Sequence, residues 1–241
     1  MNPNSGTIPF SREYSRRQFG QAAAGIVLLF SMNPVRVLGQ IAPGKLPVDL
    51  ETNKRLDSWL RINADGTVEV FTGKVEVGQG NITALAQITA EELGVGFERI
   101  RMRPADTSHS PDESYTAGSA SIEVGGGALR YAAADARATL LEMAAAKTGI
   151  SVDSLTVDDG VISSSAGVGR VTYWELASEG LLVRDARRDI PLKTNSNRHI
   201  VGTSVPRLDI PAKVTGGEAF VQDMPLPGIT IVRYLLTLVR W

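Results

Sequence analysis

Two glycines flank a glutamine at Gly78, Gln79 and Gly80. Glycine has no side chain, so the backbone here can approach a ligand closely, and the Gln79 carboxamide both donates and accepts hydrogen bonds. A helix is expected to begin at Asn81, whose side chain can cap the first amides. Unpaired amides at a helix start also attract anions. These residues alone indicate either a ligand-binding turn or a tight turn that only starts a helix.

Better-known motifs are excluded at the same place. Gly73 and Gly78 have the spacing of a phosphate-binding P-loop, but Gln79 and Gly80 stand where that motif requires Lys and Ser or Thr. The dinucleotide-binding fingerprint needs a further glycine, and Thr83 occupies its position. No Gly-x-Ser-x-Gly nucleophile elbow occurs in the chain.

Hydroxyl groups gather with glycine in a second segment. It consists of Thr116, Ala117, Gly118, Ser119, Ala120 and Ser121. Glycines at 125–127 follow, directly before a long predicted helix. Backbone amides and hydroxyls in this arrangement suit a phosphate or a polar heterocycle. A flexible loop with a helix cap is the alternative interpretation.

Other polar residues give weaker signals. His109 and His199 have no neighbouring ligand set, so surface or loop positions are expected rather than a metal site. We interpret the Glu91–Glu92 pair as the solvated side of a helix. Asp158 and Asp159 are typical of turn chemistry.

The elements that position these segments follow from hydrophobic spacing. Hairpins are expected around the Asp-Gly pairs at 65–66 and 159–160, and helices over 81–93 and 126–148. A strand running on towards Val77, a further strand at 100–103, a short helix over 172–180 and irregular chain over 190–217 complete the pattern. This order predicts an α+β fold with a mixed sheet and packed helices rather than a doubly wound parallel sheet. Residues 41–57 read as a linker.

Composition limits the chemistry further. The chain has 241 residues, 25 basic and 26 acidic side chains, and no cysteine. The absence of cysteine excludes disulfides, thiolate zinc sites, a cysteine nucleophile and any iron–sulfur cluster held by these residues. A balanced net charge argues against a nucleic-acid partner. Metal binding directly by side chains is not predicted either.

The N-terminal residues 1–40 have the pattern of an export signal. Arg16 and Arg17, with Ser15 before them and Phe19 after them, resemble the twin-arginine signal. The apolar stretch 22–30 that follows is too short to span a bilayer, which needs about 20 residues. An amphipathic or buried helix is the alternative. Twin-arginine export moves folded proteins, so periplasmic localisation and a cofactor inserted before export are expected.

Taken together, the segments resemble the molybdopterin-binding large subunit of the xanthine dehydrogenase/aldehyde oxidase family. The similar motifs are GKVEVGQG at 73–80, ALAQI at 84–88, AEEL at 90–93, PDESYTAGSAS at 111–121, KVTG at 213–216 and DMPLPG at 223–228. Within the family, their order is most similar to the beta subunits of the isoquinoline 1-oxidoreductase type and to related periplasmic aldehyde dehydrogenases. The resemblance covers about residues 58–228.

This resemblance implies a molybdenum hydroxylase that adds water-derived oxygen to a small aldehyde or N-heterocycle. By that likeness Gln79 lies near molybdenum, Gly78 and Gly80 admit the molybdopterin cofactor, and the segment 116–121 holds the pterin and its phosphates. The same group of enzymes suggests the cytosine dinucleotide form. Iron–sulfur clusters are then expected in a small [2Fe–2S] partner subunit, with a membrane-bound cytochrome c completing electron transfer.

The resemblance also implies domain boundaries. A molybdopterin-binding-like domain is expected over 58–200, and the start of a hammerhead-like domain over 201–241. The family's glutamate base lies further towards the C-terminus than Trp241, so no catalytic residue is named here, and the tail 229–241 departs from the family pattern. We therefore expect an N-terminal fragment, inactive alone. The alternative is an exported, non-catalytic binding or assembly protein on the same scaffold.

Overall fold

The computed structural model describes residues 44–103, 105–164, 169–177, 180–217, 219–220, 223 and 228. The chain divides into the units 1–40 and 41–241. The predicted export signal and the unusual tail 229–241 lie outside the described residues. Within the described part, no helix has both the length and the apolar character needed to cross a membrane.

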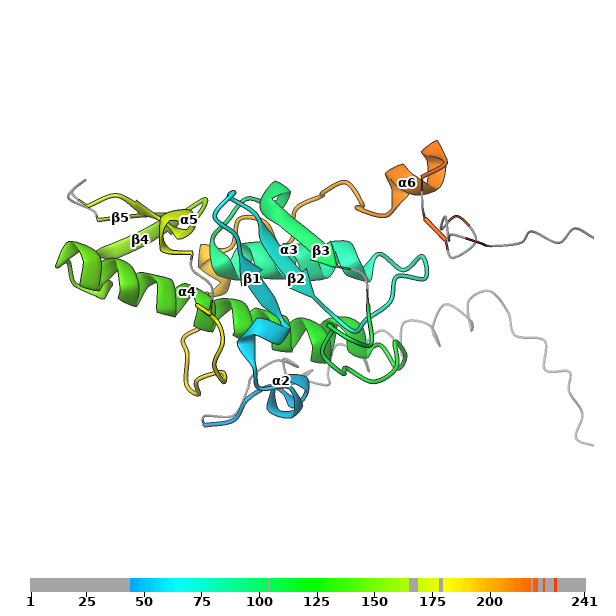
Figure 1. The fold of residues 1–241 in the computed structure, drawn as a ribbon, viewed down its shortest axis with the longest axis horizontal. Helices are drawn as coiled ribbons and strands as arrows, with labels where there is room; N and C mark the ends of the chain where they lie inside the picture. The colour runs from blue at the N-terminus through cyan, green and yellow to red at the C-terminus, as the bar shows by residue number, and fades with distance from the viewer. Residues whose placement is uncertain are drawn as a thin grey trace, which may run out of the picture. The chain divides into compact units, whose positions relative to one another are not determined.

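The elements of the second unit alternate between short strands and helices (Figure 1). The helices are α2 (Val48–Thr52), α3 (Asn81–Leu93), α4 (Gly126–Thr148), α5 (Tyr173–Leu176) and α6 (Ile210–Thr215). The strands are β1 (Leu60–Ile62), β2 (Val68–Phe71), β3 (Ile100–Arg103), β4 (Leu155–Asp158), β5 (Val161–Ser164) and β6 (Val171–Thr172). A π-turn, Ser121–Gly125, leads into α4. The predicted α+β class is confirmed.

The first sheet has the order β1-β2-β3. β1 and β2 form the predicted antiparallel hairpin, with Leu60 opposite Val70. β2 and β3 are parallel, with Val68 opposite Ile100, and α3 makes the crossover between them. The sheet is therefore mixed, as predicted. The loop that follows β2 and the start of α3 lie at the same end of this crossover.

The second sheet, β4-β5-β6, is antiparallel throughout. Its β4–β5 turn lies against the end of α3, because Gly160 donates a backbone hydrogen bond to Gly94 O at 3.0 Å. Asp159 forms an ion pair with Arg99 at 2.6 Å. Asp159 thus does more than shape the turn, since it also connects this hairpin to the residues before β3.

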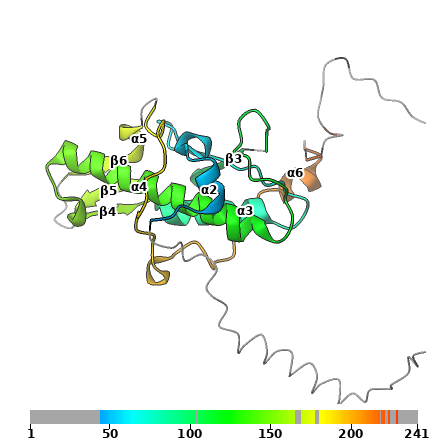
Figure 2. The ribbon, with the colours of Figure 1, turned by 90° about the horizontal axis from the view of Figure 1, so that it is seen from below.

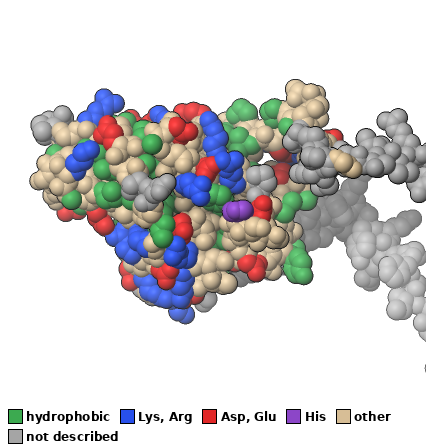
Figure 3. Space-filling view, in the orientation of Figure 1, with side chains coloured by type: hydrophobic (Ala, Val, Ile, Leu, Met, Phe, Trp, Pro, Cys, Tyr) green, Lys and Arg blue, Asp and Glu red, His purple; other side chains and the backbone are tan. Residues whose placement is uncertain are grey.

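The core centres on the contact between α3 and α4, which lie side by side (Figures 1 and 2). The predicted apolar face of α4 is buried through Leu129, Ala133, Ala136 and Leu140. Alanine favours the helix and leaves room for close packing of neighbouring elements. On the face shown in Figure 3, acidic and basic side chains are interspersed over the surface that covers this core.

Residues 44–57, expected to be a linker, are part of the domain instead. They include α2, which packs against α4 (Figure 2), and they bury Leu46, Leu50 and Leu56 in the core. The Trp59 indole donates to Asn53 O at 2.8 Å. Pro47, one of the residues that suggested a linker, lies directly before α2, between the buried Leu46 and Leu50. The apolar residues around it decide the structure.

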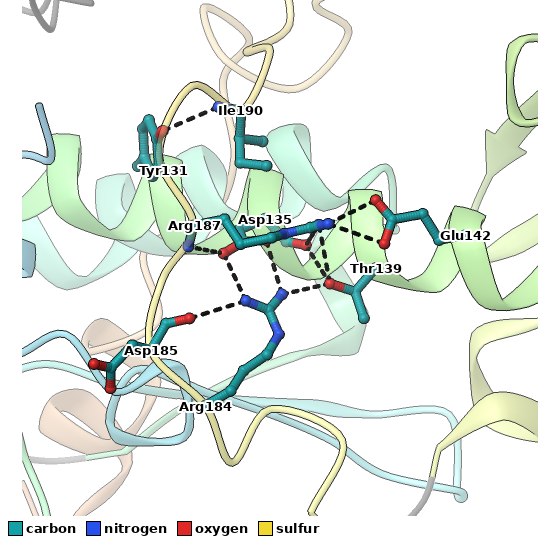
Figure 4. A network of polar contacts seen from close by, with 8 residues as sticks. All are labelled: Tyr131, Asp135, Thr139, Glu142, Arg184, Asp185, Arg187 and Ile190. Carbon is teal, nitrogen blue, oxygen red and sulfur yellow. Dashed lines mark hydrogen bonds and ion pairs between the residues drawn. The ribbon is translucent and has the colours of Figure 1, made fainter. Parts of the chain in front are cut away.

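The segment 184–190 is held against α4 by a buried carboxylate. Asp135 is 0 % exposed and accepts from Arg184 and Arg187 at 2.7–3.1 Å (Figure 4). Burial alone would raise the pKa of Asp135, but the two guanidinium groups and the Arg187 amide outweigh it, so the pKa lies below its ordinary value. Charge pairing with Asp135 therefore holds the irregular segment 184–190 in place.

The interpretation of Glu91 and Glu92 as a solvated helix side is wrong. They are 3 % and 1 % exposed. Glu91 accepts hydrogen bonds from the consecutive amides of residues 199–201 at 2.6–3.1 Å. Glu92 pairs with Arg130 and Arg137 at 3.0 and 3.1 Å. Both carboxylates turn towards chain that lies far away in sequence, which local spacing does not reveal.

Replacing Leu50 tests whether α2 belongs to the domain. Leu50→Ala should lower the free energy of unfolding by about 2–5 kcal/mol, because it leaves a cavity in a fully buried site. Val48→Ala on the same helix is the control, since Val48 is 71 % exposed. Chemical denaturation measures both, and equal small effects would show that 44–57 is a linker after all.

Replacing Asp135 tests the charge pairing. Asp135→Asn should cost about 3 kcal/mol at neutral pH, because both guanidinium groups lose their buried partner. Since the folded-state pKa is depressed, the stabilisation is present above the unfolded value of about 3.9 and is lost as the pH falls through the folded value. The stability difference between wild type and variant should therefore shrink below about pH 4. The control is Glu142→Gln at an exposed partner of Arg187.

Candidate functional site

The first candidate segment is a loop rather than the end of a strand. β2 ends at Phe71, so the predicted continuation of this strand to Val77 is wrong. Gly78 and Gly80 have φ values of 110° and 79°, a region in which residues with a side chain are strained. The two glycines are therefore required by the path of the loop.

Glu76, not Asn81, caps the start of α3. Its carboxylate accepts from the amides of Gly78, Gly80 and Ile82 at 2.7, 2.8 and 3.3 Å. Asn81 is instead the first residue of the helix, and its Nδ2 donates to a loop carbonyl at 3.1 Å. The Glu76 carboxylate therefore takes one amide of the first turn of α3, that of Ile82, and the two glycine amides that precede the helix.

The Gln79 carboxamide is folded back on its own loop. Its Oε1 accepts from the Val77 amide at 2.7 Å, and its Nε2 donates to Val75 O at 3.0 Å. An amide nitrogen carries two hydrogens, so one N–H of this exposed side chain remains available to a ligand. The loop bonds fix where that N–H is located.

The second candidate segment exposes donors. Gly118 and Ser119 both have left-handed backbone, with φ values of 63° and 60°. Ala117 and Ala120 shape the turn, since the Ala120 amide donates to Ala117 O at 3.2 Å. Among the described residues, the hydroxyls of Ser119 and Ser121 have no hydrogen-bond partner. Ser119 is exposed and Ser121 half-buried, and hydroxyls beside a left-handed turn can bind the polar edges or phosphate of a ligand.

The two segments lie beside one another. The Val75 amide of the first donates to Thr116 Oγ1 of the second at 2.8 Å. Glu113 and Lys74 add side-chain contacts between the same two loops. Of the predicted site residues, the structure thus brings the 78–80 loop and the 116–121 segment to one place.

Arg207 is part of this site, and sequence reasoning missed it. Its guanidinium donates to Gly78 O at 3.0 Å and lies 3.5 Å from the Glu76 carboxylate. Asp209 fixes the same guanidinium at 2.7 Å. Arg207, with Lys213 second, holds the pKa of Asp209 far below its usual range. No local signal marks Arg207, because its partners in the first loop lie more than a hundred residues earlier.

The available groups fit a polar organic cofactor better than a metal held directly by side chains. Ser119 and Ser121 supply hydroxyls, and Gln79 supplies one N–H. In the part of the chain that the structure describes, no group of three His, Cys, Asp or Glu side chains could hold a metal ion. His109 is 75 % exposed in its side chain, with Asp106 at 3.6 Å.

A separate cavity of about 700 Å³ lies elsewhere in the domain. Residues 60–64 of the first hairpin and 180–183 line it, together with Asp57 and Ala177. None of the predicted site residues lines this cavity. The candidate site is instead an open surface, where Tyr115 and Val77 are 86 % and 77 % exposed.

Comparison with known proteins identifies the family of this chain. The sequence model of the "Molybdopterin cofactor-binding domain" family matches residues 16–205, which is most of the chain. This chain belongs to the molybdopterin cofactor-binding domain family, within the large subunits of the xanthine dehydrogenase type.

Three relatives with known names share sequence with this chain. One subunit of the nicotinate dehydrogenase of Pseudomonas putida is 36 % identical over 191 residues, covering 79 % of this chain and 16 % of that protein. The beta subunit of isoquinoline 1-oxidoreductase from Brevundimonas diminuta is 29 % identical, covering 71 % and 27 %. The membrane-bound aldehyde dehydrogenase [pyrroloquinoline-quinone] of Gluconacetobacter polyoxogenes is 28 % identical, covering 89 % and 28 %. The chain spans less than a third of each relative's length.

The Glu76 cap is open to a direct test. Glu76→Ala should cost about 1 kcal/mol, because the Ile82 amide in the first turn of α3 and the Gly78 and Gly80 amides before it lose their acceptor. Amide exchange at Gly78, Gly80 and Ile82, followed by NMR, should become faster. The control is Glu123→Ala on the exposed π-turn before α4. Unchanged exchange in the Glu76 variant would contradict the capping role.

Proposed function

We propose that this chain supplies the first cofactor-binding loops of a molybdenum hydroxylase large subunit. The observation that carries the proposal is the hydrogen bond from Val75 to Thr116, which joins the Gln79 loop to the hydroxyl-rich segment. Membership of the molybdopterin cofactor-binding domain family supports it. Both loops then face one ligand from two sides, as a single cofactor requires.

In this proposal the two loops bind different parts of the cofactor. The free N–H of Gln79 would donate to an oxygen of the cofactor near the metal. Gly78, where an added Cβ would meet no atom within 4 Å, leaves space for the cofactor beside it, and Gly80 completes the turn. The Ser119 and Ser121 hydroxyls, with the Gly118 turn, hold the pterin and its phosphate, for which we propose the cytosine dinucleotide form. When bound, the cofactor supplies the two-electron oxidation of the substrate carbon.

The proposed substrate is a small N-heterocycle or an aldehyde. Two of the relatives are named for N-heterocycles, nicotinate and isoquinoline, and a third for an aldehyde. Electrons need a route away from the site, and the sequence contains no cysteine for a cluster. We therefore propose a small [2Fe–2S] subunit as partner, followed by a membrane-bound cytochrome c, and twin-arginine export to the periplasm.

Equilibrium binding tests this function. The purified chain is titrated under anaerobic conditions with molybdopterin cofactor released from a donor molybdoenzyme, and bound pterin is followed by fluorescence. We expect weak, saturable binding without substrate turnover. The double variant Ser119→Ala/Ser121→Ala should weaken binding about tenfold, because each lost hydrogen bond contributes about 0.5–1.5 kcal/mol.

Ser154→Ala is the matched control, because Ser154 is an exposed serine before the second sheet. It should leave the affinity unchanged. If wild-type chain shows no binding at all while its fold is intact, the alternative function gains: a non-catalytic binding or assembly protein. Binding that is unaffected by the double variant would place the cofactor elsewhere.

A further inference from the structure

A buried glutamate from the second loop reaches into the first. Glu113 is 2 % exposed, although it lies in irregular chain. Its Oε2 accepts from Thr72 Oγ1 at 2.5 Å and from the Gly73 amide at 2.6 Å. Both donors directly follow β2, where the loop that carries Gln79 begins. Glu113 therefore fixes the base of that loop.

A buried lysine runs in the opposite direction. Lys74 is 2 % exposed, and its Nζ donates to Glu113 O at 2.5 Å and reaches Tyr115 O at 3.5 Å. Each loop thus sends one charged side chain to the backbone of the other. The Val75–Thr116 hydrogen bond follows directly beyond this exchange.

Two glycines allow this close approach, Gly73 to the backbone of the second loop and Gly125 to the Glu113 and Lys74 side chains. A Cβ at Gly73 would lie 2.5 Å from Pro111 O, and one at Gly125 would lie 2.3 Å from Glu113 Oε1. The latter would also lie 3.3 Å from Lys74 Cε. The residue before α4, Gly125, thus packs against Glu113 and Lys74. A larger residue at Gly73 or Gly125 would displace its neighbours.

Burying the Glu113 carboxyl and the Lys74 ammonium group costs free energy of folding. Burial raises the pKa of Glu113, against hydrogen bonds from Thr72 and Gly73 and the charge of Lys74. Its Oε1 has no hydrogen-bond partner among the described residues. Apolar residues of similar size often stabilise a buried site better than charged groups do, and the hydrogen bonds that these two side chains make go to the opposite loop, which points to a role in positioning.

We propose that Glu113 and Lys74 are positioning residues that hold the Gln79 loop and the hydroxyl-rich segment in one fixed relation. This inference rests on the proposed function for its consequence, because a ligand held from two sides binds only when both sides keep their spacing. The pair itself does not touch the ligand. It acts through Gly73 and Val75 of one loop and Thr116 of the other.

The test combines site-resolved amide exchange with the same cofactor titration. In Glu113→Ala, exchange at Gly73 and Val75 should accelerate about tenfold or more, because the acceptor that holds the loop base is gone. Exchange at residues 132–140 of α4 should not change. Cofactor affinity should fall about tenfold through loss of preorganisation.

Conservative variants separate positioning from simple loss of fold. Glu113→Gln keeps an acceptor for Gly73 and should retain protection of that amide and near-normal affinity. Should Glu113→Ala fail to fold, Thr72→Val removes one donor only and should accelerate exchange at Gly73 by several-fold. Glu142→Ala, on the exposed side of α4, is the control and should leave the loops unchanged.

The outcomes distinguish the two proposals. Unchanged exchange at Gly73 and Val75 in both Glu113→Ala and Thr72→Val would overturn the positioning role. Uniform acceleration across α4 as well would also overturn it, because Glu113 would then be only a stabilising residue. If the loop amides respond as expected but wild-type chain binds no cofactor, positioning stands and the proposed function fails.

Discussion

Buried carboxylates hold the irregular segments of this domain in place. An ionised carboxylate cannot be buried without partners, so each one draws donors from chain that would otherwise have no fixed position. Glu91 binds the amides of 199–201, Asp135 binds two arginines of 184–187, and Glu76 and Glu113 organise the two candidate loops. The helices α3 and α4 supply the rigid support from which the first two of these side chains act.

This division explains how a site can form on loops. The α3–α4 contact and the mixed sheet form one apolar core, which sets the distance between the end of β2 and the start of α4. Both candidate segments lie in that gap. Lys74 and Glu113 then fix the position of one segment against the other. Arg207, from much later in the chain, adds a hydrogen bond to the first segment. The site therefore depends on three irregular segments, which side-chain hydrogen bonds rather than helix or sheet bonds hold together.

Much of the fold could be predicted, because the spacing of apolar and turn residues along the chain indicates helices, strands and hairpins. The bounds of α4 and the strand at Ile100 followed from apolar periodicity and glycine stops. The partners of Glu91, Glu92 and Asp135 could not be predicted, since a glutamate on a helix looks the same whether water or distant amides surround it. For the site, residue types located the loops. The Glu76 cap depends on how its loop folds back, and the Arg207 contact depends on a partner far away in sequence. Neither could be inferred from the residue types nearby.

The Glu76 cap has an electrostatic consequence for how a ligand enters. A carboxylate already occupies the position where the start of α3 would attract a phosphate, and Arg207 balances its charge locally. Arg207 and Lys213 balance the carboxylates of Glu76 and Asp209, so an incoming anionic group meets no unpaired positive charge there, whereas the Ser119 and Ser121 hydroxyls have no hydrogen-bond partner among the described residues. The groups of this surface that stay available to a ligand are therefore neutral hydrogen-bonding groups, the Ser119 and Ser121 hydroxyls and one N–H of Gln79.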